Sequence, residues 1–147
     1  MIVRELSTAD CRKVLSSKGL ARLACSQADQ PYIVPILCYF DEEADCLYSV
    51  AAVGQKIDWM RANPKVCVEF GEIADQFNWT TVLVFGRFEE LTEAEADAQA
   101  RRKAHELFEQ RYEWWFPAML KPASDERARA VVYRIRIERI SGRQAAR

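Results

Sequence analysis

The sequence predicts a mainly β fold in which antiparallel strands close into a small barrel decorated by helices. Short apolar segments recur along the chain and are separated by polar or Gly- and Pro-containing turns, as expected for strands joined by hairpins. The last such segment, residues 131–140, alternates apolar and charged side chains with a period of two, which indicates a strand with one wet face. With 147 residues the chain is expected to form one domain, residues 1–147.

The first element is expected to be a short helix over residues 7–17. Ser7 or Thr8 can cap its start, and Val14 and Leu15 are apolar residues that would face inward. Gly19 then ends the helix. The sequence therefore predicts a helix that packs on the barrel before the first hairpin.

Strands are expected over six segments: residues 20–25, 31–40, 46–52, 66–73, 78–91 and 131–140. The segment 31–40 is apolar on both faces, which suggests burial between the core and either a partner subunit or a ligand. Pro35 must lie at an edge or a bulge, because proline has no N–H to donate to a sheet. Gly86 predicts a bulge or bend in its strand.

Two further helices are expected, over residues 56–63 and 92–112. The second is rich in Ala, Glu, Gln and Arg, which are good helix formers. Thr92 and Glu95 match the pattern of a capping box at its start. A break with two tryptophans follows before the closing strand.

The corner between the strand 46–52 and the helix 56–63 is the best candidate for a binding site. Backbone N–H groups at a helix start are unpaired and partly positive, so an anion is stabilised there. Lys56 adds a full positive charge, and the small residues Ser49, Ala51 and Ala52 would let a flat ligand approach the backbone. The pattern indicates a phosphate with a planar body attached, although an ordinary turn with a surface lysine would also give it.

Composition excludes several classes of protein. The net charge of −1 and the pI near 5.9 disfavour bulk nucleic-acid binding. No apolar run approaches the roughly 20 residues that span a bilayer, and the N-terminus lacks the apolar core of a signal peptide. Five scattered cysteines without a Cys-x-x-Cys pair indicate reduced core thiols rather than a metal site. We therefore expect a cytoplasmic protein without membrane or nucleic-acid partners.

The order and spacing of these segments carry a family resemblance. The run GLARLAC, PYIVPILCYF, LYSVAAVGQKIDWMRANPKVCVEF and WTTVLVFGRFEEL resembles the FMN-binding split β-barrel family related to pyridoxamine 5'-phosphate oxidase, in the branch that includes nitroimidazole-resistance reductases. The resemblance implies an antiparallel, dimeric split barrel with FMN in the grooves between two subunits. It also implies a flavin-dependent oxidoreductase, with a small-molecule substrate or electron donor that the sequence does not name.

The resemblance also implies which residues hold the flavin. In one subunit, the strand against the flavin ring would hold Val34, Pro35 and Ile36. The strand that lines the ring and the ribityl chain would hold Ser49, Val50 and Ala51. The phosphate end would be held by Gln55 and Lys56. The second subunit would reach across with Trp79, Thr80 and Thr81, and the hydroxyls of Thr80 and Thr81 could bond the flavin edge or its phosphate.

Several positions limit the functional analogy. Many relatives in the nitroimidazole-resistance branch carry histidine where this chain has Val50, and the basic residues that bind pyridoxal phosphate in the oxidases have no match here. His105 fits an exposed helix residue better than a haem ligand, and Trp114 and Trp115 are either an aromatic plug or a wall over the flavin. No residue is assigned as a catalytic acid or base. The alternatives are a non-catalytic flavin-binding or electron-carrier module and a split barrel that binds haem or deazaflavin.

Overall fold

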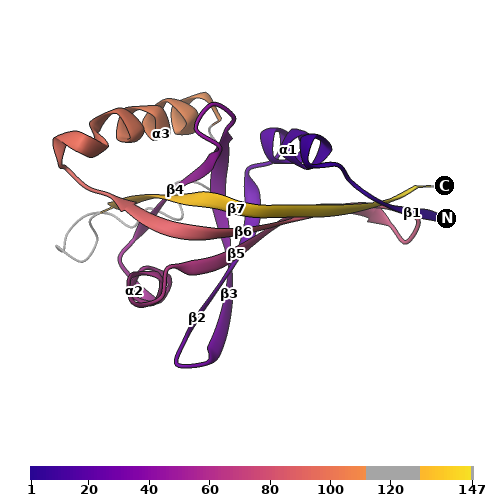
Figure 1. Ribbon diagram of the computed structural model, residues 1–147, viewed down its shortest axis with the longest axis horizontal. Coiled ribbons are helices and arrows are strands. Elements are labelled where there is room, and N and C mark those ends of the chain that lie inside the picture. Colours follow the sequence, from indigo (N-terminus) through magenta and orange to yellow (C-terminus); the bar gives the residue numbers. More distant parts are fainter. Residues whose placement is uncertain (112–129, 147) are drawn as a thin grey trace.

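The computed structural model describes residues 1–111 and 130–146 (Figure 1). Its elements follow in this order: β1 (Ile2–Glu5), α1 (Thr8–Ser17), β2 (Leu20–Gln27), β3 (Gln30–Asp41), β4 (Cys46–Ala52), α2 (Gln55–Ala62), β5 (Lys65–Asp75), β6 (Asn78–Leu91), a 3₁₀ turn η1 (Glu95–Asp97), α3 (Ala98–Gln110) and β7 (Ala130–Ala146). The predicted mainly β fold with helical decoration is confirmed, and β7 extends well beyond its predicted end.

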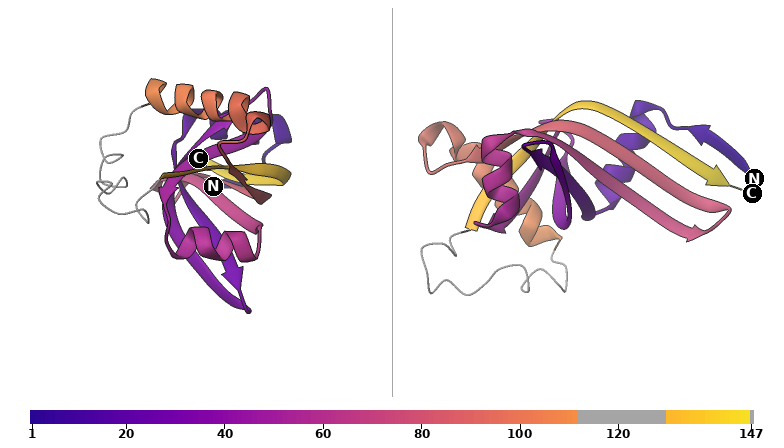
Figure 2. Two further views of the ribbon diagram at one scale, coloured as in Figure 1. Left: turned by 90° about the vertical axis from the view of Figure 1, so that its left-hand side faces the viewer. Right: turned by 90° about the horizontal axis from the view of Figure 1, so that it is seen from below.

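Six strands close into an antiparallel barrel. Their order is β7-β4-β3-β2-β5-β6, and β6 pairs with β7 to complete the circle, while β1 pairs only with the end of β7. Helices α1 and α2 bury Leu15 and Ile57 in the same core as the inward-facing strand residues. Helix α3 packs on the outside, over Tyr48 of β4 and Val132 of β7, in a separate small cluster. Helices α1 and α3 lie on one side of the strands and α2 lies on the other (Figures 1 and 2).

The strands β5, β6 and β7 continue past the barrel as an arm. We define the arm as residues 71–81, residues 141–146 and strand β1, which pair with one another through Ile2↔Ala146 and Trp79↔Ala145. Figures 1 and 2 show the arm projecting to the side opposite α2 and α3, with both chain ends at its tip. The β6 and β7 ladder therefore connects the barrel to the arm without a break in the chain.

Gly86 lies where the β6 and β7 ladder changes register. The pairing shifts between Phe85 and Gly86, so the predicted bulge is confirmed. A Cβ atom at this glycine would lie 2.3 Å from the backbone oxygen of Arg136 and 2.7 Å from a methyl group of Ile135. Only a residue without a side chain lets the two strands approach this closely.

The start of the third helix differs from the prediction. Helix α3 begins at Ala98 after the 3₁₀ turn, rather than at a capping box on Thr92. The Asp97 carboxylate accepts hydrogen bonds from both the backbone N–H and the hydroxyl of Thr92, at 2.8 and 2.9 Å. The Thr92 hydroxyl in turn accepts from the N–H of Ala94. These local bonds hold the segment in a turn, because Thr and Asp side chains compete with helical backbone bonds.

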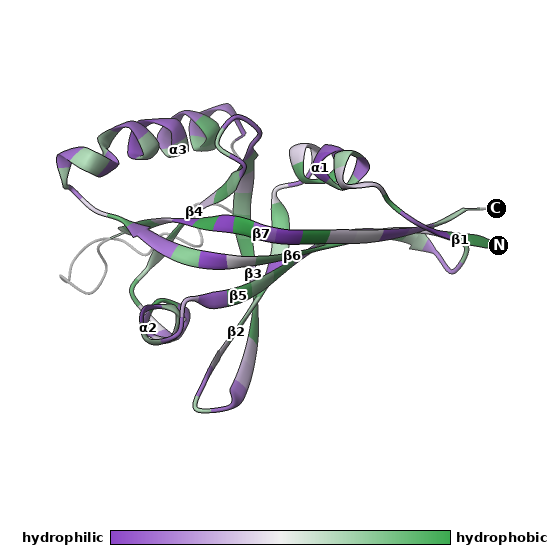
Figure 3. Ribbon diagram, in the orientation of Figure 1, coloured by the Kyte–Doolittle hydropathy of each residue, from purple (hydrophilic) through white to green (hydrophobic). Residues whose placement is uncertain are grey.

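Hydropathy follows the strand pattern. Figure 3 shows hydrophobic and hydrophilic residues alternating along β6 and β7, as expected when one face of each strand packs on the core. None of the helices in residues 1–111 and 130–146 is long and apolar enough to cross a membrane.

Candidate functional site

The ladder between β3 and β4 opens partway along the two strands. They pair only where residues 38–41 face residues 46–49. Beyond this point residues 31–37 of β3 pair only with β2, and residues 50–52 of β4 pair only with β7. We call this interruption of the ladder the split. Among the described residues it leaves two strand edges whose backbone groups have no strand partner, and such groups require a partner of some kind.

The backbone groups of β3 that face the split can be assigned from two hydrogen bonds. Cys38 donates its N–H to Gly19 on the β2 side, and the carbonyl of Leu37 accepts from the Ser49 hydroxyl on the β4 side. Because successive residues direct their backbone groups to opposite edges, Ile33 and Pro35 face the split together with Leu37. Pro35 therefore lies on an open edge, as predicted, and its missing N–H costs no ladder bond there.

Helix α2 begins just beyond the end of β4 that borders the split. Gly54 is its N-cap residue and offers no side chain to bond the free N–H groups of the first turn. A Cβ atom placed on Gly54 would meet no atom closer than the Ala52 oxygen at 4.0 Å, so this corner is open. The helix start therefore presents unpaired donors to an accessible space, as the sequence predicted.

Lys56 lies at this corner and is half-buried. Burial lowers the pKa of its ammonium group, and the nearby Cys25 opposes that shift. In residues 1–111 and 130–146, no carboxylate forms an ion pair with Lys56. A partly buried cation without a counter-charge is costly, and an anionic ligand would remove the cost. The geometry thus supports an anion-binding role for Lys56.

Side chains of the predicted strand residues lie on two faces. Ala51 and Ile36 belong to the barrel core, and Ser49 is buried at 1% exposure. Val50 points the other way and packs against the cluster beneath α3, while Pro35 is exposed. The split is therefore bordered by the predicted residues of β3 and β4 mainly through their backbones.

The predicted residues of β6 lie on the arm, away from α2. Thr80 shares the face of the core residue Val82, and its hydroxyl accepts a hydrogen bond of 3.2 Å from Gln144. Trp79 and Thr81 occupy the opposite face of the strand. Figures 1 and 2 place this part of β6 at the far end of the molecule from α2, so a single chain does not bring the two halves of the predicted site together.

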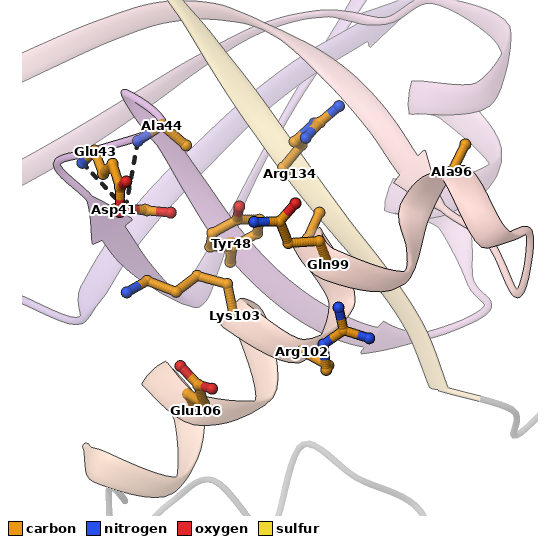
Figure 4. Close-up of a pocket in the computed structure, with 11 residues that line it drawn as sticks. Asp41, Glu43, Ala44, Tyr48, Ala96, Gln99, Arg102, Lys103, Glu106 and Arg134 are labelled. Carbon is orange, nitrogen blue, oxygen red and sulfur yellow. Dashed lines mark hydrogen bonds between the residues drawn. The ribbon is translucent and has the colours of Figure 1, made fainter.

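A separate groove of about 570 Å³ runs between α3 and the barrel, and sequence reasoning did not anticipate it. Figure 4 shows Gln99, Arg102, Lys103 and Glu106 of α3 facing Tyr48 and Arg134 from the strands. None of the predicted site residues lines this groove. Acidic and basic side chains are mixed along it, so it has no clear preference for one charge.

The remaining candidates behave differently. His105 is exposed on α3, in agreement with its interpretation as a surface residue. Arg101 of α3 is held by neighbouring groups, because it donates a hydrogen bond to the Leu91 carbonyl and forms an ion pair with Glu93. Trp114 and Trp115 lie outside the described residues, so their two interpretations stay predictions.

Two residues near the split were not singled out from the sequence. Cys25 is buried and lies within electrostatic reach of Lys56, and burial raises the pKa of its thiol while Lys56 lowers it. Tyr133 is fully buried in β7, directly opposite Ser49 in the β4 and β7 ladder. The alternation of the last strand placed Tyr133 on one face with Val131 and Ile135, but only the register gives its neighbour.

Comparison with known proteins identifies the family. Residues 7–144 match the family model described as pyridoxamine 5'-phosphate oxidase. The fold is therefore a split β-barrel, and the chain belongs to the pyridoxamine 5'-phosphate oxidase family, as the sequence resemblance implied.

Individual relatives support this assignment. The chain is 39% identical over 148 residues to an uncharacterized protein of Rhizobium meliloti (strain 1021), with 99% of this chain and 97% of the relative covered. Its structure is similar to that of a protein from Mesorhizobium loti described as FAD-binding, at 37% identity, with 100% and 99% of the two chains covered and a TM-score of 0.82. A nitroimidazole antibiotic resistance protein from Bacteroides thetaiotaomicron shares the fold at 16% identity and a TM-score of 0.68, over 98% and 89% of the chains.

Proposed function

We propose that this protein binds FMN between two copies of the chain and acts as a flavin-dependent oxidoreductase. The observation that carries the proposal is the half-buried ammonium of Lys56, which has no ion pair among the described residues and stands beside the uncapped start of α2. A phosphate dianion matches both features, since it accepts hydrogen bonds from free N–H groups and pairs with the lysine.

The split suits the flat part of a flavin. The Pro35 carbonyl and the backbone groups of Ile33 face the open edge of β3 and have no partner in β4. The polar edge of an isoalloxazine ring offers both donors and acceptors, so it can complete the bonds that the ladder leaves unmade. With the phosphate at Lys56, the ring would lie along these backbone groups.

The arm supports assembly as a homodimer. The outer sheet face that runs from the barrel into the arm carries Leu83 and Phe85 of β6, with Arg139 stacked at 4.2 Å over the Phe85 ring, and it includes the exposed Ile73 of the arm and Leu20 of β2. An apolar sheet face of this kind favours burial against another protein surface. Trp79 and Thr81 lie on the same outer face. A second copy of the chain can therefore present its Trp79 and Thr81 to the split of the first copy.

When bound, FMN supplies the hydride or electron transfer, and the protein binds and orients it. The residues described above have roles in binding only, and no side chain is assigned as an acid or base. FAD is the second candidate cofactor, because the 37% identical protein of Mesorhizobium loti is described as FAD-binding. A carrier without its own substrate would use the same binding residues.

Purification followed by titration with FMN and FAD tests the proposal. We expect a yellow protein that releases FMN on denaturation and elutes from a sizing column as a dimer. A colourless monomer that ignores both flavins would contradict the proposal, and a Soret band would indicate haem instead. Turnover of a reduced nicotinamide with an electron acceptor would then separate an enzyme from a carrier.

A further inference from the structure

The groove between α3 and the barrel is a cavity that the proposed flavin site does not use. Its volume of about 570 Å³ falls within the range of roughly 300–1,000 Å³ that is typical of small-molecule sites. Tyr48 of β4 forms its floor and is 2% exposed, while α3 and the turn between β3 and β4 form its walls (Figure 4). None of the residues proposed to hold FMN lines it, so an occupant of this groove would be a second ligand.

Asp41, where β3 meets this turn, is a buried carboxylate of which only one oxygen is satisfied. Only 6% of its surface is exposed. Its Oδ1 atom accepts hydrogen bonds from the N–H groups of Glu43 and Ala44, at 3.1 and 3.4 Å. Among residues 1–111 and 130–146, no group donates a hydrogen bond to Oδ2 and no cation forms an ion pair with Asp41.

Figure 4 shows the Asp41 carboxylate pointing into the groove, toward Tyr48. A buried charge without a counter-charge is costly, and a buried carboxylate oxygen favours a hydrogen-bond donor. A positively charged donor in the groove would meet both requirements at once. Asp41 therefore selects for a ligand that carries an ammonium group.

Charges of both signs line the groove, but they are not evenly spread. Figure 4 shows the carboxylates on one side of Tyr48 and the guanidinium groups on the other: Asp41, Glu43 and Glu106, and then Arg102 and Arg134. Arg134 is already paired with Glu89. Arg102 is exposed and forms no ion pair within the described part of the chain. A ligand anion therefore finds its free cation at Arg102.

Lys103 is a competitor for Asp41 within the chain. The two residues line the groove together and also share a neighbouring cavity with Glu43. Lys103 forms no ion pair with a described residue, but a lysine side chain is long and flexible enough to change its position. The test below therefore includes its removal.

We propose that this groove binds a small zwitterion, with its ammonium group at the Asp41 carboxylate and its carboxylate at the Arg102 guanidinium. The ammonium group donates to Oδ2, and the planar fork of an arginine matches a carboxylate. The part of the ligand between the two charges lies over Tyr48. The proposal is independent of flavin binding, because the two sites share no residue.

Isothermal titration calorimetry with linear amino acids, from γ-aminobutyrate to ε-aminocaproate, tests the proposal on the purified protein. We expect at least one of them to bind, and hexylamine and hexanoate, which carry one charge each, to bind about tenfold more weakly or less. Equal binding of hexylamine would overturn the zwitterion in favour of a simple cation. Absence of binding throughout the series at millimolar concentration would overturn the site.

Asp41→Asn is the decisive variant. The amide oxygen of asparagine can still accept the two N–H bonds of the turn, while the negative charge is lost. We expect it to weaken binding of the best amino acid by about tenfold or more. Glu42→Gln is the matched control, because it removes the same charge from an exposed neighbour that does not line the groove. Equal affinity of Asp41→Asn and the unmodified protein would overturn the site.

Two variants of α3 test the other end of the ligand. Arg102→Gln should weaken binding of the amino acid by a similar factor without changing that of hexylamine. Lys103→Gln should leave amino acid binding unchanged or tighter, because a competitor for Asp41 is lost. The reverse pattern would place the carboxylate at Lys103 and overturn the assignment of Arg102. Both changes keep a good helix former in α3, so they test the proposal even if Asp41→Asn fails to fold.

Discussion

Two strand ladders of the barrel, which we call seams, differ in how many residue pairs they hold. The β6 and β7 seam holds 13 paired positions with one bulge, whereas the β3 and β4 seam holds 4 and then opens into the split. The long seam fixes the arm relative to the barrel, and the short one leaves backbone groups available for a ligand. In this fold continuous pairing fixes geometry, and the interruption of pairing lies where we propose that the flavin binds.

Breaking the continuous seam should have the largest effect. Gly86→Ala places a Cβ atom 2.3 Å from the Arg136 oxygen, which forces the two backbones apart. We expect the free energy of unfolding to fall by about 2–3 kcal/mol, measured by urea denaturation. Ser141→Ala, at an exposed position on the same β7 strand, should change it by less than about 0.5 kcal/mol. Equal effects of the two changes would mean that the seam tolerates separation.

Removing the cation at the open seam should affect binding rather than stability. Lys56→Ala should weaken FMN binding by about 1–3 kcal/mol, because a charge-assisted contact with the phosphate is lost. Isothermal titration calorimetry measures the change. Lys65→Ala, an exposed lysine on β5, is the control and should bind FMN normally. An unchanged dissociation constant for Lys56→Ala would remove this lysine from the site.

The arm offers a comparison between adjacent threonines. Thr81 lies on the outer face proposed to meet the second copy, whereas the Thr80 hydroxyl is held by Gln144 within its own chain. Thr81→Val should therefore weaken FMN binding by about 0.5–1.5 kcal/mol, the net value of one hydrogen bond. Thr80→Val should leave FMN binding within error of the unmodified protein. A larger effect at Thr80 would assign the inner face of the arm to the ligand.

The smallest effect concerns pH and the long seam. Burial acts to raise the pKa of Glu89 on β6, but hydrogen bonds from Arg134 and Arg136 on β7 outweigh it and hold that pKa below the usual 4.5. The stabilisation is present above pH 4.5 and is lost as the pH falls through the lowered pKa.

Glu89→Gln should accordingly destabilise the protein by about 0.5–1 kcal/mol at pH 7, since the pair is partly exposed. The difference in the free energy of unfolding between Glu89→Gln and the unmodified protein should become smaller in acid. Urea denaturation at pH 7 and at low pH measures it. Glu93→Gln, whose carboxylate pairs with Arg101 but is 92% exposed, should show little effect at either pH. A gap that widens in acid would contradict the assignment.

Local patterns predicted most of the elements. The alternation of residues 131–140, the Ser7 cap and the glycine within residues 78–91 each depend on near neighbours, and the structure confirms all three. The predicted start of the third helix was wrong, because helix propensity does not account for the competing hydrogen bonds between Thr92 and Asp97.

The split depends on register, which residue type alone does not fix. Whether β3 and β4 pair at 4 positions or more is decided by where β2 and β7 hold them, and these contacts are distant in sequence. The opposite faces of Thr80 and Thr81 follow from strand alternation and were within reach of the sequence. The position of Tyr133 opposite Ser49 was not, because it depends on the register between β4 and β7.

The strand β7 pairs with β1, β4 and β6 and is the last element of the chain described here. Until residues 130–146 have been synthesised, β4 and β6 both present open edges, and the circle of strands has no closure. Contacts of such large sequence separation slow folding, and exposed edges invite aggregation. The barrel therefore cannot close before β7 is available to cover the edges of β4 and β6. We expect folding to be slow and strongly cooperative.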